Sequence, residues 1–239
     1  MKRIRRAYSK TVSLIDETAV QIYQSFVGKK KGFLLESYDK NNGRYVFMGK
    51  NPEEVIKSKE NGLVIEKEDG TTKELSGNPV DLLKGYYSDF EIRKDDEQLA
   101  FTGGLVGGLG YDFVRYKEEL PDNNPDEIGI STISLMLVTE FLSIDHFAET
   151  MTAVVVEDDT EAGRKKAMFR CEEMVKEAFE NIQKDEKSEF LPDGKIIKQS
   201  DTLEEYSEKV NKIKQYIIDG HVFQTVLSQR WTIETKQKG

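Results

Sequence analysis

The densest group of residues that could do chemistry is the stretch Phe101–Tyr116, which reads FTGGLVGGLGYDFVRY and contains five glycines. Glycine-rich loops bind phosphates when their backbone N–H groups surround the anion. A dinucleotide loop needs Gly-x-Gly-x-x-Gly, but counting from Gly108 and Gly110 the third position is Phe113. A P-loop needs a Gly-Lys-Ser/Thr ending, and no glycine of this stretch is followed by lysine. The glycines therefore indicate close packing inside a sheet, with a turn or short helix after Gly110.

A second candidate lies where the apolar strand Gly32–Tyr38 ends in Glu36 and Ser37. A turn rich in Asp, Asn and Gly then leads into the return strand Arg44–Gly49, which is typical of a hairpin. Cross-strand geometry can bring Glu36 and Arg44 close enough to contact one small zwitterion. The same residues also suit an edge-strand glutamate and a turn serine without any ligand. The residues alone leave both interpretations open.

Composition narrows the class of function. The chain has 35 Lys and Arg against 44 Asp and Glu, a net charge of −9, which disfavours nucleic acid or an anionic membrane as the main partner. No run of about 18 apolar residues predicts a membrane span. Cys171 is the only cysteine, which excludes an internal disulfide and is typical of a reducing cytoplasm. His146 and His221 have no Cys or His at ligand spacing, so no metal site is expected.

Hydrophobic periodicity predicts helices at residues 18–27, 51–59, 78–90, 160–182 and 202–220. Hairpins are predicted at 32–49 and 62–75, and two long strands are predicted on either side of His146. This succession has no regular β-α-β alternation, so it predicts an α+β fold with antiparallel sheets packed in a sandwich-like way and helices outside.

Three other segments complete the expected organisation. The basic segment Met1–Lys10 is interpreted as a solvated arm before a short strand at 12–16. Residues 91–97 are predicted to form a charged loop. Residues 222–234 alternate between apolar and polar side chains, which predicts a long strand.

Three stretches of this chain resemble the large subunit of anthranilate synthase. The first is GGLVGGLGYDFVRY followed by Leu120 and Pro121, in which Gly108 replaces a usual aromatic residue. The second is LLES at residues 34–37 followed by GRY at 43–45. The third is DGHVFQTVLSQRW at residues 219–231. The resemblance covers essentially the whole chain.

The resemblance implies roles for particular residues. Leu35, Glu36 and Ser37 would contact L-tryptophan, the end product that inhibits these enzymes, and Arg44 would hold the ligand carboxylate. Gln224 occupies a position where related enzymes that add water to chorismate carry a lysine base. A neutral glutamine cannot act as a base, so Gln224 fits the branch that uses ammonia.

The resemblance also implies a domain plan. Residues 1–182 would form a regulatory domain, 183–199 a linker and 200–239 the start of a chorismate-binding catalytic domain that is incomplete at Gly239. The complete enzyme would convert chorismate and ammonia, supplied by a glutamine amidotransferase subunit, to anthranilate and pyruvate. Its Mg²⁺ ligands would lie beyond Gly239, with no cofactor in this chain, and the chain alone is expected to be inactive. The alternatives are aminodeoxychorismate synthase component I and a stand-alone amino-acid-binding module.

Overall fold

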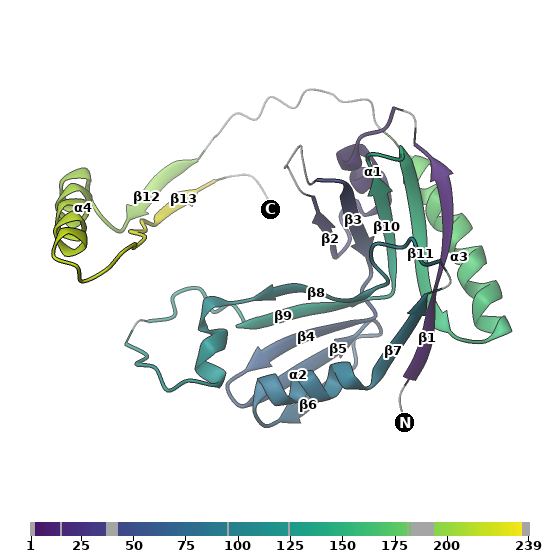
Figure 1. Ribbon diagram of the computed structural model, residues 1–239, viewed down its shortest axis with the longest axis horizontal. Coiled ribbons are helices and arrows are strands. Elements are labelled where there is room, and N and C mark those ends of the chain that lie inside the picture. Colours follow the sequence, from purple (N-terminus) through teal and green to yellow (C-terminus); the bar gives the residue numbers. More distant parts are fainter. Residues whose placement is uncertain are drawn as a thin grey trace. The chain divides into compact units, whose positions relative to one another are not determined.

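A computed structural model describes residues 3–14, 16–36, 43–94, 96–123, 125–180, 182 and 194–235. The chain divides into two compact units, Met1–Asp185 and Glu186–Gly239 (Figure 1). The larger unit contains two sheets and three α-helices, and the smaller contains one helix and a pair of strands, within the part of the chain described. The predicted domain limits at residues 182 and 199 stay a prediction.

The first sheet of the larger unit has six strands in the order β2-β3-β10-β11-β1-β7. All of its neighbouring strands are antiparallel except β1 and β7, which are parallel. The strands are β1 (Arg3–Ser13), β2 (Gly32–Leu35), β3 (Tyr45–Lys50), β7 (Phe90–Lys94), β10 (Glu140–Asp145) and β11 (Thr150–Asp158).

The second sheet has five antiparallel strands in the order β6-β5-β4-β9-β8. Its strands are β4 (Glu54–Lys59), β5 (Gly62–Lys67), β6 (Thr72–Ser76), β8 (Gly104–Leu109) and β9 (Ile133–Val138). The predicted hairpin with Asp69-Gly70 at its turn is confirmed as β5–β6, and a short 3₁₀-helix, η1 (Tyr111–Tyr116), follows β8 as expected.

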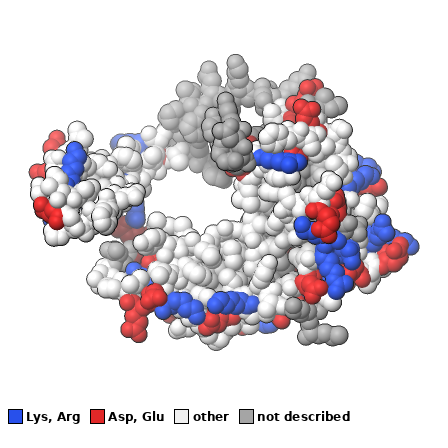
Figure 2. All heavy atoms as spheres, in the orientation of Figure 1, with Lys and Arg blue, Asp and Glu red and all other residues white. Residues whose placement is uncertain are grey.

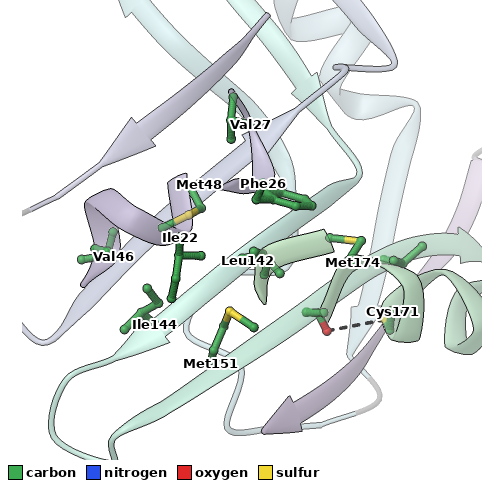
Figure 3. Close-up of a cluster of buried hydrophobic side chains, with 14 of the residues drawn as sticks. Ile22, Phe26, Val27, Val46, Met48, Leu142, Ile144, Met151, Cys171 and Met174 are labelled. Carbon is green, nitrogen blue, oxygen red and sulfur yellow. Dashed lines mark hydrogen bonds between the residues drawn. The ribbon is translucent and has the colours of Figure 1, made fainter. Parts of the chain in front are cut away.

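Helices α1 (Ala19–Phe26) and α3 (Glu161–Glu180) cover one face of the six-stranded sheet (Figure 1). Thr18 and Gln21 form a capping box at the start of α1, which satisfies N–H groups that have no partner inside the helix. Beneath the helices lies a buried apolar cluster (Figure 3). Its largest fully buried members are Ile22, Phe26, Met48, Leu142, Ile144, Met151 and Met174.

The opposite face of the six-stranded sheet packs partly against the five-stranded sheet. Ala7, Phe141 and Val154 of the first sheet share a buried cluster with Val106 and Val138 of the second. Helix α2 (Pro79–Ser88), capped by Asn78, covers the other face of the five-stranded sheet through a third cluster. The expected α+β class, with antiparallel sheets and flanking helices, is confirmed.

The smaller unit pairs β12 (Lys195–Gln199) with β13 (Trp231–Glu234) and contains α4 (Leu203–Ile218). The predicted capping box at Thr202 and Glu205 is present. The predicted strand over 222–234 is wrong for residues 222–230, which are irregular, because no neighbouring strand among the described residues pairs with them. The apolar stripe of α4 is also not buried: Tyr206 is half-buried and Ile217 is exposed.

The basic N-terminal segment is not a solvated arm, so this interpretation was wrong. It forms β1, an interior strand of the sheet between β11 and β7, with Ala7 and Tyr8 buried. Its cations are neutralised by long-range partners: Arg5 Nη1 lies 2.6 Å from Glu53 and Arg6 Nε lies 2.7 Å from Asp159. Figure 2 shows Lys and Arg interspersed with Asp and Glu on the face in view.

Two further predictions of secondary structure are corrected. Residues 54–59 form strand β4, not a helix, because Val55 and Ile56 are β-branched and are buried on opposite faces between β5 and β9. Asn51 has φ of +51°, which does not suit an N-cap. Residues 90–94 form strand β7, not a charged loop, and its charged side chains are tolerated because β7 is an edge strand.

Gly107 in β8 and Gly103 just before this strand allow close packing, as predicted for part of the glycine-rich stretch. A Cβ atom at Gly107 would lie 2.2 Å from the carbonyl oxygen of Ser134, and Gly107 has φ of +152°. A Cβ at Gly103 would lie 2.7 Å from the carbonyl oxygen of Val138. At Gly108, where the resembling family carries an aromatic residue, a Cβ would meet nothing within 4 Å.

Gly107 and Gly108 are adjacent in the chain but differ in the space around them, so substitutions at the two positions can be compared directly. Gly107→Ala should lower the free energy of unfolding by roughly 2 kcal/mol, because both the dihedral angle and the contact oppose a side chain. Gly108→Ala should raise it by about 0.5 kcal/mol, because alanine reduces the entropy of the unfolded chain and meets no obstacle. Urea unfolding followed by circular dichroism measures both. Equal effects of the two substitutions would contradict the close-packing interpretation.

Candidate functional site

Arg44 lies immediately before β3 and is held by Asp145, the last residue of β10. Its Nη2 donates to Oδ2 of Asp145 at 2.7 Å and its Nε lies 3.0 Å from both carboxylate oxygens. The guanidinium also lies over the ring of Tyr45, 4.9 Å from its centre. The geometry joins two strands that are neighbours in the sheet and far apart in sequence.

Asp145 has a second task, because it also organises the turn after β10. Its Oδ1 accepts hydrogen bonds from the backbone N–H groups of Phe147 at 3.0 Å and Ala148 at 3.2 Å. The hydrogen bonds from Arg44 lower the pKa of Asp145, and they outweigh burial, which acts in the opposite direction. The carboxylate is therefore ionised and positions the guanidinium at neutral pH.

Arg44 and Asp145 line a cavity of about 480 Å³. The cavity wall is rich in hydroxyl groups, including those of Ser143 and Thr152. It lies on the face of the six-stranded sheet that is turned away from α1 and α3, because side chains alternate between faces along a strand. Thr152, for example, stands between Met151 and Ala153, which are buried under the helices. This face of the six-stranded sheet therefore has two neighbouring parts. One is apolar and packs on the five-stranded sheet, and the other is polar and lines the cavity.

The other residues expected in the tryptophan site are not all brought together. Leu35 is the last residue of β2, pairs with Phe47 and is 48% exposed. Glu36 follows directly and is exposed. Neither residue lines the cavity that contains Arg44. Ser37 lies outside the described residues, so the convergence of all four on one ligand stays a prediction.

Sequence reasoning missed Asp145 as the partner of Arg44. Only a local signal existed, since an aspartate at a strand end commonly accepts hydrogen bonds from the backbone of the following turn. Residues 144–146 were expected to form a turn, but Ile144 and Asp145 are the last residues of β10 and the turn begins at His146. The ion pair spans 101 positions, a separation at which a single sequence carries no pairing signal.

Gln224 lies in the smaller unit, in the irregular segment between α4 and β13, and its side chain is exposed. Nothing in the structure tests its expected catalytic role, which stays a prediction. In the part of the chain described, no three His, Cys, Asp or Glu side chains converge so that they could hold a metal ion.

Comparison with known proteins adds the decisive observation. A family model described as chorismate binding enzyme matches residues 31–238. The chain belongs to the chorismate binding enzyme family. The match includes the hairpin around Arg44, the five-stranded sheet, the six-stranded sheet apart from β1, and the described residues of the smaller unit.

Relatives of this family member are named anthranilate synthase component 1. The protein of Acetivibrio thermocellus is 32% identical over 231 residues, which cover 92% of this chain and 47% of that protein. The protein of Aquifex aeolicus is 30% identical over 234 residues, with 92% and 46% covered. The chain thus spans about half the length of the curated relatives it matches.

A solved structure supports the fold. Anthranilate synthase component I from Streptococcus pneumoniae TIGR4 has a TM-score of 0.54 and 22% identity to this chorismate binding enzyme family member. The likeness covers 95% of this chain and 49% of that one. Among the described helices, none is long and apolar enough to cross a membrane.

The ion pair between Arg44 and Asp145 predicts a pH-dependent effect. Because the pKa of Asp145 is lowered on folding, its contribution to stability is fully present above the unfolded value of about 3.9 and is lost as pH falls through the folded value. Asp145→Asn should therefore reduce stability at pH 7, and the difference from wild type should shrink towards zero in strong acid. Urea titrations at a series of pH values measure it.

Asp112→Asn is the matched control, because Asp112 also pairs with an arginine, Arg115, but at an exposed position of η1. Surface pairs of this kind contribute little. If Asp145→Asn remained less stable than wild type by the same amount below pH 3, the charge of Asp145 would not be the cause of the lost stability.

Proposed function

We propose that this chain is the N-terminal half of an anthranilate synthase component 1, which uses chorismate and ammonia to form anthranilate and pyruvate. The observation that carries the proposal is the match of relatives with that name along nine tenths of the chain, at about 30% identity. In this proposal a glutamine amidotransferase subunit supplies the ammonia. Mg²⁺ and most chorismate contacts belong to the other half of the polypeptide, where the metal would stabilise negative charge on the substrate.

Gln224 supports the ammonia-using branch of the family. A side-chain amide stays neutral and cannot remove a proton from water, whereas a lysine with a lowered pKa can. Gln224 would therefore leave the attack on chorismate to ammonia, which needs no such base. The nearest rival, aminodeoxychorismate synthase component I, also uses ammonia, so Gln224 does not separate the two. The LLES segment and the glycine strand are the features that favour anthranilate synthase.

The hairpin around Arg44 is proposed as the regulatory tryptophan site, with Leu35, Glu36 and Ser37. Arg44 presents five N–H donors, and Asp145 takes up those on Nε and Nη2. The Nη1 group has no partner among the described residues, so it can donate to the carboxylate of a bound amino acid. Asp145 would then act as a positioning residue that keeps the guanidinium directed at its ligand.

A stand-alone amino-acid-binding module is the second candidate function. The cavity beside Arg44 fits it. The two functions differ in whether the complete polypeptide turns over chorismate.

The complete polypeptide, with chorismate, ammonium and Mg²⁺, should produce anthranilate, which is read by its fluorescence. This chain alone should produce none, because electrostatic stabilisation of the transition state needs groups from the other half. Formation of aminodeoxychorismate in place of anthranilate would establish the rival enzyme. Tryptophan binding without any turnover of chorismate by the complete polypeptide would establish the binding module.

In the complete polypeptide, Ser37→Arg and Arg44→Met should each abolish inhibition by tryptophan and leave uninhibited turnover largely intact. A ligand inhibits by binding one state better than another, so removing its site leaves the active state populated. Lys59→Met is a suitable control, because Lys59 is a surface residue of β4 that pairs with Glu74. Unchanged inhibition curves for both site variants would refute the assignment.

A further inference from the structure

A second cavity, of about 510 Å³, lies on the five-stranded sheet beside the C-terminal half of α2. Its walls come from β4, β5, β6, α2 and the start of β1, and it shares no lining residue with the cavity around Arg44. A volume of this size is typical of sites for small molecules. The function proposed above does not use it.

A nearly buried carboxylate lies in the wall of this cavity. Glu54, the first residue of β4, is only 7% exposed, and its Oε2 accepts a hydrogen bond from the hydroxyl of Tyr86 at 2.6 Å. Burial and the neighbouring carboxylate raise the pKa of Tyr86, so this hydroxyl keeps its proton and stays a donor. Within the described residues, Glu54 has no ion pair, and its Oε1 has no hydrogen-bond partner.

Glu53, the residue before Glu54, has the interactions expected of a purely structural carboxylate. Glu53 points the other way and receives two hydrogen bonds from Arg5, at 2.6 and 2.9 Å. Burial raises the pKa of Glu53, but the hydrogen bonds and charge of Arg5 outweigh burial and lower it. Burying a carboxylate is costly unless a cation compensates it. Glu54 is more deeply buried than its neighbour, forms no ion pair among the described residues, and faces a cavity.

Three cations also line the same cavity. Lys67 is the direct cross-strand neighbour of Glu54, and Lys73 lies on the adjacent strand β6. The guanidinium of Arg3 lies over the ring of Phe90, 4.0 Å from its centre. Among the described residues, none of these three cations forms an ion pair. The lining also has three carboxylates, those of Glu54, Asp81 and Asp89, of which Asp81 is already paired with Lys117 at 3.1 Å.

The rest of the wall is apolar. Ile65 and Leu75 come from the sheet and Leu82 from α2. Because charges of both signs line the cavity, it suits a ligand that carries both charges close together, with an apolar group for the wall. Side chains at directly paired strand positions stand about 5 Å apart, so both can contact the ammonium and the carboxylate of one α-amino acid.

We propose that the cavity between Glu54, Tyr86 and Lys67 binds a free α-amino acid with an apolar side chain. Glu54 accepts hydrogen bonds from the ligand ammonium, and Lys67 with Arg3 contacts the ligand carboxylate. Tyr86 positions the Glu54 carboxylate, and Ile65, Leu75 and Leu82 contact the side chain. This site is separate from the hairpin site around Arg44 and does not depend on the function proposed for it.

Isothermal titration of the purified chain with L-phenylalanine tests the proposal. Saturable binding is expected, whereas phenethylamine, which lacks the carboxylate, and 3-phenylpropionate, which lacks the ammonium, should each bind at least about tenfold more weakly. Absence of saturable binding of both L-phenylalanine and L-leucine at millimolar concentrations would overturn the proposal. Equal binding of phenethylamine and L-phenylalanine would also overturn it.

Three variants locate the site. Glu54→Gln and Lys67→Met should each weaken L-phenylalanine binding about tenfold or more, because each loses a charged hydrogen-bond partner. Tyr86→Phe keeps the packing of the ring and should weaken binding less than Glu54→Gln or Lys67→Met does. It provides a second test of the site if Glu54→Gln fails to fold. Binding that is unchanged in both Lys67→Met and Tyr86→Phe would refute the site.

Two controls separate this site from its surroundings. Glu74→Gln removes a carboxylate from β6 that points to the opposite face from Lys73, and binding should be unchanged. Arg44→Met alters only the first cavity, and binding of L-phenylalanine should again be unchanged. Loss of binding in Arg44→Met with retention in Glu54→Gln would place the ligand at the hairpin and refute the second site.

Discussion

The larger unit depends on a change of sheet within one continuous strand segment, which occurs at Thr139. Strand β9 ends at Val138 and pairs with β4 and β8, whereas β10 begins at Glu140 and pairs with β3 and β11. Thr139 stays anchored at this corner, because its carbonyl oxygen accepts a hydrogen bond from Val156 N at 2.8 Å. The sequence had indicated a single long strand here. A long apolar segment cannot reveal that its two halves pair with different sheets, since both halves have strand periodicity.

Glycines allow the strands to approach at this corner, and ion pairs hold helix α3 beside it. Added Cβ atoms at Gly103 and Gly49 would lie 2.7 Å from the carbonyl oxygen of Val138 and 3.0 Å from that of Glu140, so glycine allows the strands to approach. Beyond the corner, Arg170 of α3 lies 2.9 Å from the carboxylate of Glu140. Arg170 also pairs with Glu177, which in turn bonds the ammonium of Lys50, a side chain only 5% exposed. The helix is thereby tied to β10, which begins at the corner, and to its neighbour β3.

The parts of the fold that sequence reasoning predicted are those set by local chemistry. Thr18 with Gln21, Asn78 before Pro79 and Thr202 with Glu205 all begin helices where predicted, because a cap depends on residues within one turn. The strands β1, β4 and β7 were missed for the opposite reason. Their charged side chains are compatible with strands only through partners far away in sequence, as when Arg5 meets Glu53. The same distinction applies to the candidate site. Arg44 was predicted from the local pattern of its hairpin, whereas Asp145 was missed because it lies 101 positions away in the sequence.

The two cavities follow from the same constraint on the sheets. Each sheet has one face that is only partly covered by the other sheet or by a helix. Along that face the side chains change from apolar to polar at the point where the covering layer ends. On the six-stranded sheet the change runs along β11, from Val154 and Val156 under the second sheet to Thr150 and Thr152 at the cavity. On the five-stranded sheet it runs along β5, from Leu63 and Ile65 under α2 to Lys67 at its end. Strand alternation keeps each series on one face, so polar groups gather where packing stops. Both proposed ligand sites therefore lie at the limits of the core, on strands that the core itself positions.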